Sequence, residues 1–488
     1  MICIIGVGLY LSIRTNFLQI RKFPYAIRVT IGRMLRKREA SDGSLTPFQA
    51  VCTALAATVG TGNIAGVAGA IAIGGPGAVF WMWISALLGM CTKFSEVTLA
   101  VHFRETNANG DLVGGPMYYI KNGLKKHWHW LAYLFSAFGV LTVFGTGNAT
   151  QVNTITTAID SALINYNVIA ADNTSTVNLV MGIILAILVA MILLGGIKRI
   201  GQVTEKLVPF MALFYIILAV GVVIINWKNV PGVFQRYHQR GDLIRSSVTG
   251  GVVGSFFMSM KKVFPEVFFP IEAGLGTGSI AHACADTRKP VKQGMFGIFE
   301  VFTDTIVICT LTGFVVVMAH CWTGADAESW QALDKLPKYT ESIAVLTPGT
   351  AMNGIVTFLV TLCFCLFAFT CLLGMISFSE IAANRIRKDK ICINFVRCIG
   401  LFVAAFGILC NIAGLELGNL WAFSDLGNIL IVFFNVPIVY VGAKYVFRAT
   451  RHYKKNDGTP FTSEVIGRND CAYWDEQAKK AVKNFSGK

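Results

Sequence analysis

"ATVGTGNIAG", residues 57–66, interrupts a long apolar run with Gly60 and Gly62 on either side of Thr61, followed directly by Asn63. Glycine in a helix interior costs about 1 kcal/mol relative to alanine, and polar side chains inside an apolar span are costly as well. The stretch therefore predicts that a helix opens at this point, and that the opened backbone has a use.

The surrounding composition is that of a membrane protein. The chain has 488 residues, of which 54% are hydrophobic and only 14% charged, whereas a soluble protein carries about 25% charged residues. Apolar stretches of about 20 residues, long enough to cross a bilayer as helices, recur along it. We therefore predict an all-α polytopic membrane protein. The 13 cysteines lack metal-ligand spacing, so neither a cofactor nor a metal is expected.

Eleven transmembrane helices are expected, with the first too short to cross comfortably, which leaves open whether the N-terminus is complete. Their ranges are 2–13, 47–73, 77–101, 130–160, 176–196, 203–226, 246–283, 293–321, 350–378, 392–412 and 418–446.

The basic residues predict the topology. Of the 42 Lys and Arg residues, 32 lie in one alternating set of connections and in the tail, and six lie in the other set. This asymmetry places the N-terminus outside and the C-terminus in the cytoplasm of a bacterial inner membrane. The formal net charge of +15 is then a topology signal, and no nucleic acid partner is expected. Of the six Lys and Arg residues in the connections predicted to lie outside, four are in 227–245. This connection therefore agrees least well with the predicted topology.

The spans divide into an N-terminal helix and two sets of five. The predicted parts are 1–46 (N-terminal helix and basic loop), 47–226 (first repeat), 246–446 (second repeat) and 447–488 (basic tail). Because five is odd, the second set crosses the membrane in the opposite sense to the first. This is the 5+5 arrangement of inverted-repeat transporters.

The first span of each set is the glycine-rich one. "TVGTGNIAG" in the first set is matched by "EAGLGTGSIAHA" (272–283) in the second, where Glu272, Gly274 and Gly276 mark the expected half-helix break. Freed N–H groups suit a carboxylate, and freed carbonyls suit Na⁺ or an ammonium group. The alternative is that the glycines only permit close helix packing.

Four polar features inside other spans are also candidates. Asn148 and Gln151 share a helix face and suit either substrate contact or interhelical hydrogen bonding. The Thr370 hydroxyl could bind a hard cation or its own helix carbonyl. Asp304 is an acid deep in an apolar span, either functional or hydrogen-bonded to a neighbouring threonine. Lys93 and Glu96 are predicted to be a structural i, i+3 pair.

Several stretches together resemble the alanine/glycine–cation symporter family: "GLYLSIRTNFLQIRKFP", "TVGTGNIAGVAGAIAIGGPGAVFWMW", "GGPMYYI", "GNATQVN", "EAGLGTGSIAHA" and "DTIVICTLT". The resemblance covers nearly the whole chain. It implies a leucine-transporter-like fold with one extra N-terminal helix, and Na⁺-coupled or sometimes H⁺-coupled uptake of small neutral amino acids.

The resemblance also implies site residues. The expected substrate-binding residues are Thr61, Gly62, Asn63, Asn148, Gln151, Cys371 and Met375, and the expected cation-binding residues are Val59, Gly60 and Thr370. Cys371 stands where the family usually has a second threonine, and Met375 where many members have a tryptophan. Because sulfur is a poor ligand for Na⁺, the departure at Cys371 weakens a cation site on that span.

Residues 263–271, "VFPEVFFPI", depart most from the family, which would read Gly-Val-Ser-Arg-Gly-Val-Phe-Ser-Asn here. With suitably chosen codons, deleting one G from that coding and adding one base after it reproduces all nine residues. We therefore predict a compensated frameshift, in the gene or in its sequencing. The alternative is genuine divergence with a rebuilt site.

The sequence thus predicts a secondary transporter, a symporter of Na⁺ and alanine or glycine, with lipid, Na⁺ and a small neutral amino acid as partners. An H⁺-coupled symporter or exchanger of a larger neutral amino acid such as glutamine is the alternative, and a channel is a further one. An enzyme is disfavoured, because no metal-spaced cluster or nucleophile–base set is recognisable.

Overall fold

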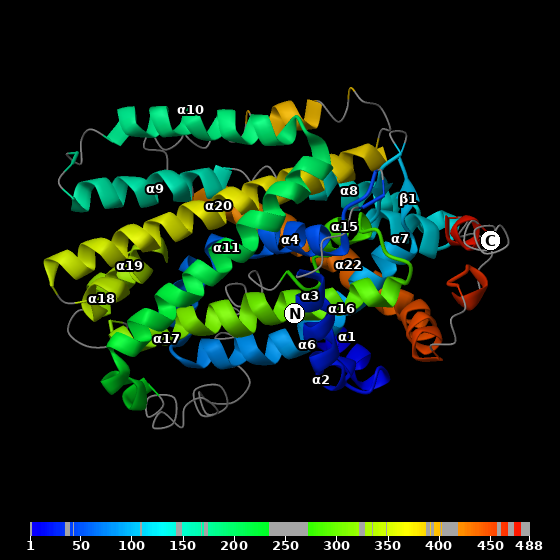
Figure 1. The fold of residues 1–488 in the computed structure, drawn as a ribbon, viewed down its shortest axis with the longest axis horizontal. Coiled ribbons are helices and arrows are strands. Elements are labelled where there is room, and N and C mark those ends of the chain that lie inside the picture. Colours follow the sequence, from blue (N-terminus) through cyan, green and yellow to red (C-terminus); the bar gives the residue numbers. More distant parts are fainter. Residues whose placement is uncertain are drawn as a thin grey trace.

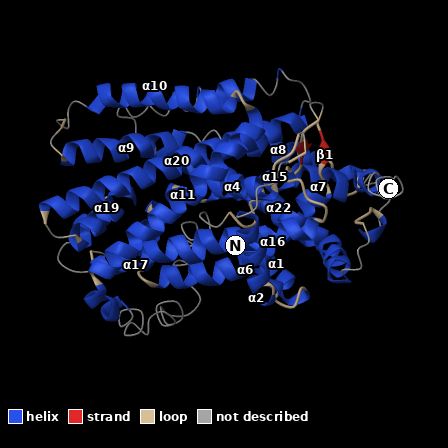
Figure 2. Cartoon of the chain, in the orientation of Figure 1, coloured by secondary structure: helices blue, strands red, loops and turns tan. Residues whose placement is uncertain are grey.

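The structure is a computed structural model of a helical protein, shown in Figures 1 and 2. It describes residues 2–34, 40–41, 43–107, 110–142, 149–166, 168–169, 174–233, 272–321, 327–333, 335–347, 349–386, 391, 395–400, 402, 418–455, 460–466 and 473–479. Its described strands are β1 (Glu105–Thr106) and β2 (Leu112–Val113), an antiparallel pair.

The first part of the chain, up to residue 233, is a series of helices. They are α1 (Ile2–Arg14), α2 (Leu18–Arg21), α3 (Phe23–Met34), α4 (Pro47–Thr58), η1 (Thr61–Asn63), α5 (Ala65–Gly74), α6 (Gly77–His102), α7 (Pro116–Gly123), η2 (Lys126–Trp128), α8 (Trp130–Thr142), α9 (Thr150–Asn165), α10 (Thr174–Leu193), α11 (Gly196–Ile225) and η5 (Trp227–Asn229).

The part from residue 272 onward is also helical. It contains α15 (Thr277–Ala283), α16 (Pro290–Val301), the π-helix η6 (Phe302–Cys309), α17 (Thr310–Ala319), α18 (Ala327–Ala332), α19 (Lys335–Leu346), α20 (Thr350–Ile386), α22 (Gly418–Lys455) and η7 (Glu464–Ile466).

Within the described ranges, six helices are long and apolar enough to cross a membrane, or seven if the bent pair around residue 60 is counted as one span. The predicted spans 246–283 and 392–412 lie largely outside those ranges. The count of eleven, the extra N-terminal helix and the division into two repeats therefore stay predictions.

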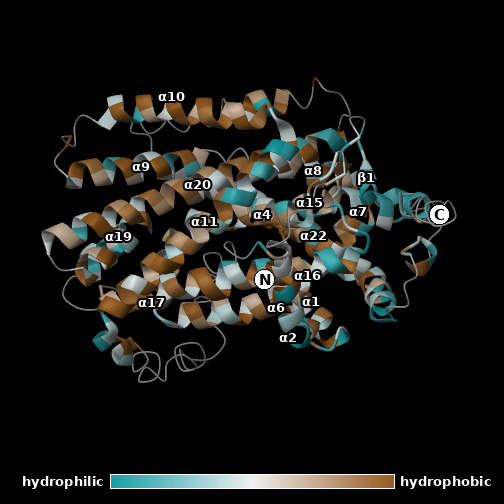
Figure 3. Ribbon diagram, in the orientation of Figure 1, coloured by the Kyte–Doolittle hydropathy of each residue, from teal (hydrophilic) through white to brown (hydrophobic). Residues whose placement is uncertain are grey.

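The outer helices present apolar side chains to their surroundings. Figure 3 shows hydrophobic residues along α9, α10 and α17, and more hydrophilic ones near the C-terminus. On α10, only 28% of its most apolar stretch is buried inside the protein, and Ile183 and Ile187 are more than half exposed. A helix with this exposed apolar surface is suited to face lipid.

The two glycine-rich spans approach each other in the interior, where α4 contacts α15 directly, α15 packs on α6, and α4 packs on α16. At one end they are joined by backbone hydrogen bonds: the Leu45 N–H donates to the Cys284 carbonyl (2.9 Å), and the Asp286 N–H donates to the Leu45 carbonyl (2.7 Å). This pairing, the Leu45–Ala285 bridge, places the start of the first broken span beside the end of the second.

Candidate functional site

The first break lies between α4 and η1. A capping box of Thr46 and Gln49 begins α4, with Pro47 in its first turn, and the helix ends where Val59 and Gly60 take extended conformations. The axis bends by 63° there, which confirms the opening predicted from the glycines. A helical turn leaves its first N–H groups without partners inside the turn, so the break offers backbone donors and acceptors.

Asn63 fastens this break to the π-helix. Its Oδ1 accepts a hydrogen bond from the Gly60 N–H (3.0 Å), and its Nδ2 donates to Asp304 Oδ1 (2.5 Å). The backbone carbonyl of Asn63 accepts from the Thr312 hydroxyl (3.0 Å). Asp304 is fully buried and also accepts from Thr305 Oγ1 (2.8 Å). π-Helical turns inside α-helices are frequent at functional sites, and here one carries the acid that meets the break.

Two further helices contact the same break. The Thr61 hydroxyl donates to Gln151 Oε1 (3.2 Å) from α9. On α20, Cys371 Sγ donates to the Ala57 carbonyl (3.2 Å), and a β-carbon at Gly60 would lie 3.3 Å from that sulfur. The structure therefore brings Thr61, Asn63, Gln151 and Cys371 together around Gly60.

Gly62 differs from its neighbours because the space beside it is open. A β-carbon there would meet no other atom within 4 Å, although Thr61 and Asn63 on either side are buried. From the sequence alone, a β-branched side chain at Gly62 is expected to clash where the backbone opens. That expectation is wrong, because the protein leaves room here. The open space beside the break is instead where a substrate could lie.

We expect Gly62→Val to fold with an unchanged melting temperature and to lose uptake, because the new side chain fills this space. One methyl group in a pocket is worth roughly tenfold or more in discrimination, so Gly62→Ala should lie between the wild type and Gly62→Val. Initial uptake rates at matched protein density measure this. Normal kinetics in both variants would show that the space is not used by substrate.

The second break precedes α15. Glu272, Gly274 and Gly276 have positive φ angles of 45°, 101° and 79°, a backbone region that glycine adopts freely and glutamate rarely does. Asn435 of α22 donates to the Gly274 carbonyl (2.8 Å), and a β-carbon at Gly276 would overlap Pro116. Position 276 therefore requires glycine, because its φ angle is positive and a side chain there would overlap Pro116.

The remaining predicted residues are placed as follows. The Thr370 hydroxyl donates to the Phe367 carbonyl of its own helix (3.1 Å) and lies 3.2 Å from Met211 Sδ. Val59 is buried at the end of α4. Met375 is partly buried, one helical turn beyond Cys371, and packs against the core. The predicted contact at Asn148 lies outside the described residues.

A network of charged side chains was not predicted from the sequence. Lys93 forms an ion pair not with Glu96 but with Glu300 of α16, at 2.9 Å, with both side chains fully buried. Glu96 instead accepts from Asn435 Nδ2 (2.7 Å). His282 Nε2 lies 2.9 Å from the other oxygen of Glu300. Acidic residues in apolar spans are the sequence signal that could have drawn attention to Glu300.

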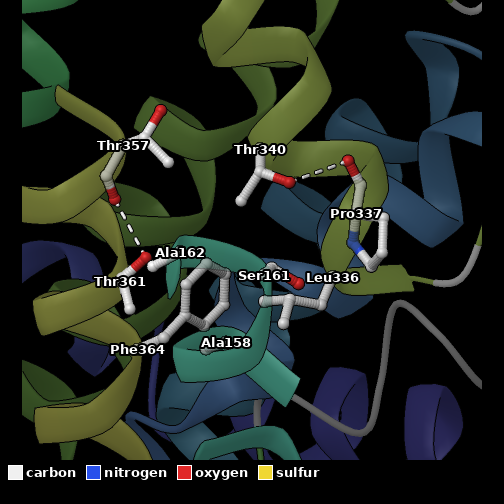
Figure 4. Close-up of a pocket in the computed structure, with 9 residues that line it drawn as sticks. All are labelled: Ala158, Ser161, Ala162, Leu336, Pro337, Thr340, Thr357, Thr361 and Phe364. Atoms are coloured by element: carbon white, nitrogen blue, oxygen red, sulfur yellow. Dashed lines mark hydrogen bonds between the residues drawn. The ribbon is translucent and has the colours of Figure 1, made fainter. Parts of the chain in front are cut away.

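A hollow lies further along α9, two helical turns beyond Gln151 (Figure 4). It is a small cavity of about 20 Å³ between α9, α19 and α20. Its lining is mixed, with three threonines and a serine among apolar groups: Ala158, Ser161, Ala162, Leu336, Pro337, Thr340, Thr357, Thr361 and Phe364.

Paired broken spans that meet polar side chains in the interior of a helical bundle define a secondary transporter. The chain matches the sodium:alanine symporter family over residues 1–465, and it belongs to that family. It is a helical membrane protein of amino acid transport and sodium symport, and not an enzyme.

Its relatives are transporters too. An uncharacterized transporter of Haemophilus influenzae is 36% identical over 455 residues, covering 93% of this chain and 92% of the relative. The sodium/alanine symporter AgcS of Methanococcus maripaludis is 34% identical over 445 residues, covering 88% and 91%. The probable sodium/glutamine symporter GlnT of Bacillus subtilis is 34% identical over 488 residues, covering 100% and 91%.

Among solved structures, MhsT in complex with L-phenylalanine has a similar fold. Its TM-score is 0.56 at 13% identity, covering 88% of this chain and 92% of that one. At this identity the similarity concerns the fold alone. The fold is therefore that of leucine-transporter-like proteins.

Proposed function

We propose that the protein imports alanine or glycine together with Na⁺ by alternating access, and that the amino acid binds beside Gly62. The open space at the first break is the observation that carries this proposal. The N–H groups of the η1 turn suit the substrate carboxylate. Gln151 and Cys371 close two sides of the break, which favours a small side chain.

Hard oxygen atoms near the break support Na⁺ as the coupling ion. Asp304 and Asn63 present carboxylate and amide oxygens from two different helices, and hard cations prefer such ligands. The carbonyls of Val59 and Gly60 follow at the end of α4, and that of Gly60 also accepts the Asn63 N–H (3.2 Å). We assign Asp304 to this role beside the predicted Val59, Gly60 and Thr370.

The test is uptake of labelled alanine into proteoliposomes. We expect accumulation with an inward Na⁺ gradient, and little when K⁺ replaces Na⁺ or when only a proton gradient is present. Protein-free liposomes are the control. Equal uptake under all three conditions would contradict Na⁺ coupling, and flux without any accumulation against a gradient would indicate a channel.

A larger neutral amino acid such as glutamine is the second candidate substrate. Two observations favour it: Met375 replaces the rigid indole usual in the family, and GlnT is similar over the whole of this chain. Methionine is flexible and can make way for a longer side chain. If the protein instead imports such an amino acid with H⁺, the ion-replacement experiment above would show uptake driven by the proton gradient and not by Na⁺.

We expect Met375→Trp to remove inhibition by glutamine while retaining that by alanine, because an indole would occupy the space that methionine can vacate. A competition panel against labelled alanine measures this, with Met352→Trp on the exposed face of the same helix as the control. If glutamine does not compete with alanine in the wild type, the roomier pocket is ruled out.

The orientation proposed from the basic residues puts the hollow of Figure 4 on the outer side, since α19 lies in the predicted external connection 322–349. Substrate would then enter along α9 toward Gln151. The variant Ser161→Cys can be treated in whole cells with a thiol reagent that does not cross the membrane. Labelling would support the external position of the hollow, and protection by substrate would support entry along α9.

A further inference from the structure

The buried ion pair of Lys93 and Glu300 lies between the two breaks. Lys93 lies on α6 and Glu300 on α16. Thr58, at the end of α4, has its hydroxyl 2.9 Å from Glu300 Oε1 and 3.2 Å from Glu272 Oε2. Thr277, the first residue of α15, donates to Glu272 Oε2 (3.1 Å). The pair is thus part of one cluster between both broken spans.

This cluster presents oxygen atoms from four segments of the chain. They are Glu272 Oε2, Glu300 Oε1 and the hydroxyl oxygens of Thr58 and Thr277. Carboxylate and hydroxyl oxygens are the ligands that hard cations prefer. An uncompensated pair of buried carboxylates is very unfavourable, so a positive charge is required here.

Lys93 supplies that charge, and the surrounding packing leaves room for its side chain. A β-carbon at Gly278 would overlap its Nζ, and one at Gly297 would lie 3.3 Å from its Cγ. Two glycines on neighbouring helices therefore leave room for this side chain. Its ammonium pairs with Glu300 and also interacts electrostatically with Glu272 and Glu96. Because it is covalently held, it cannot leave with the substrate.

The other ionisable groups facing the cluster are already engaged. His282 contacts Glu300 through Nε2 and Gln293 through Nδ1, both at 2.9 Å. Glu96 bonds Asn435, and Asp304 bonds Asn63 and Thr305. No cation other than Lys93 is paired with Glu272 or Glu300 among the side chains that the structure describes, apart from His282 if protonated.

We propose that Lys93 is a tethered cation, and that its ammonium fills a site that would otherwise take up one exchangeable positive charge. Lys93 is then a positioning residue that keeps this cluster from contributing an ion to the coupling. The proposal goes beyond the proposed function and depends on it only for the transport readout. Without Lys93, the Glu272–Glu300 cluster should bind a monovalent cation or a proton.

The primary experiment measures the melting temperature of the purified full-length chain in detergent, which needs no substrate. Wild type, Lys93→Met, Lys93→Met/Glu300→Gln and Lys121→Met are compared in NaCl and in choline chloride, each at pH 5.5 and pH 8. Lys121 forms a partly exposed ion pair with Glu105 (2.6 Å), so it is the matched control for losing a lysine from a pair.

We expect Lys93→Met alone to gain several degrees from Na⁺, from low pH or from both, beyond any gain in the wild type and in Lys121→Met. A gain from Na⁺ identifies a metal-ion site, and a gain only at pH 5.5 identifies a proton site. The double variant should lose this added dependence because it has one carboxylate fewer. The same ion and pH response in Lys93→Met as in the wild type would overturn the proposal.

If Lys93→Met cannot be recovered in choline chloride at pH 8, recovery in NaCl, at pH 5.5 or by adding Glu300→Gln supports the proposal, and failure of all three overturns it. If the wild type transports alanine and a proton fills the site in Lys93→Met, uptake by this variant should fall as pH rises. The fall should be about tenfold per pH unit steeper than in the wild type. The thermal result stands even if alanine proves not to be the substrate.

Discussion

Asn63→Ala is expected to reduce Na⁺-driven uptake by on the order of 100-fold, because it leaves two buried groups without partners at an estimated 1–3 kcal/mol each. These are the Gly60 N–H, which donates to Asn63 Oδ1, and Asp304 Oδ1, which accepts from Asn63 Nδ2. Loss of Asn63 Oδ1 frees the break and removes a proposed Na⁺ ligand, and loss of Asn63 Nδ2 leaves Asp304 Oδ1 without its amide partner. Initial uptake rates against Na⁺ concentration, at matched protein density, measure the effect.

A matched control exists elsewhere in the chain. Asn178 on α10 is buried and donates to Asp160 of α9 (2.8 Å), so Asn178→Ala breaks a comparable amide–carboxylate pair far from the break. It should lower the melting temperature while uptake is retained. Equal loss of uptake in both variants would indicate general destabilisation, and normal kinetics in Asn63→Ala would remove Asn63 from the site.

The second large effect concerns residues 263–271. Replacing them by Gly-Val-Ser-Arg-Gly-Val-Phe-Ser-Asn is expected to raise uptake by about tenfold or more over the chain as written, since a proline inside a helix costs about 3 kcal/mol and the predicted span contains Pro265 and Pro270. The segment runs directly into Glu272, whose carboxylate joins the two breaks. Its sequence therefore bears directly on the site.

Resequencing the DNA over this stretch comes first, because it separates a reading error from a change in the gene. If the DNA is as written, uptake is compared between the chain as written and the replaced chain at equal expression. A scrambled nine-residue replacement of the same composition is the control. Full activity of the chain as written would show that 263–271 is a genuine variant site, and the frameshift proposal would fail.

The features that local sequence determines were the ones that could be predicted. Glycines beside a polar residue in an apolar run are enough to predict an opened helix, and the 63° bend follows them. Thr61 and Gln151 come from separate motifs, and both were expected in one site because the resemblance to the symporter family implies it. Thr370 lies against its own helix carbonyl, which was one of its two predicted arrangements.

Features that depend on tertiary packing could not be predicted. Lys93 and Glu96 are close in sequence, so local spacing paired them, but their side chains contact different helices and meet Glu300 and Asn435. The room beside Gly62 is likewise a property of several helices at once. Sequence spacing describes neighbours along one helix, whereas burial of a charge is decided by the residues on the helices that surround it.

The Leu45–Ala285 bridge has a mechanical consequence. Backbone hydrogen bonds need no particular side chain, so this join ties the start of α4 to the end of α15 for any residues but a proline at 45 or 286. We expect the start of α4 and the end of α15 to move together as a rigid unit. The far ends of the two broken spans can then separate. Spin labels at Ser44 and Asp286 should report one constant separation throughout the transport cycle. This distance can then serve as the reference against which changes in other inter-helix distances are measured.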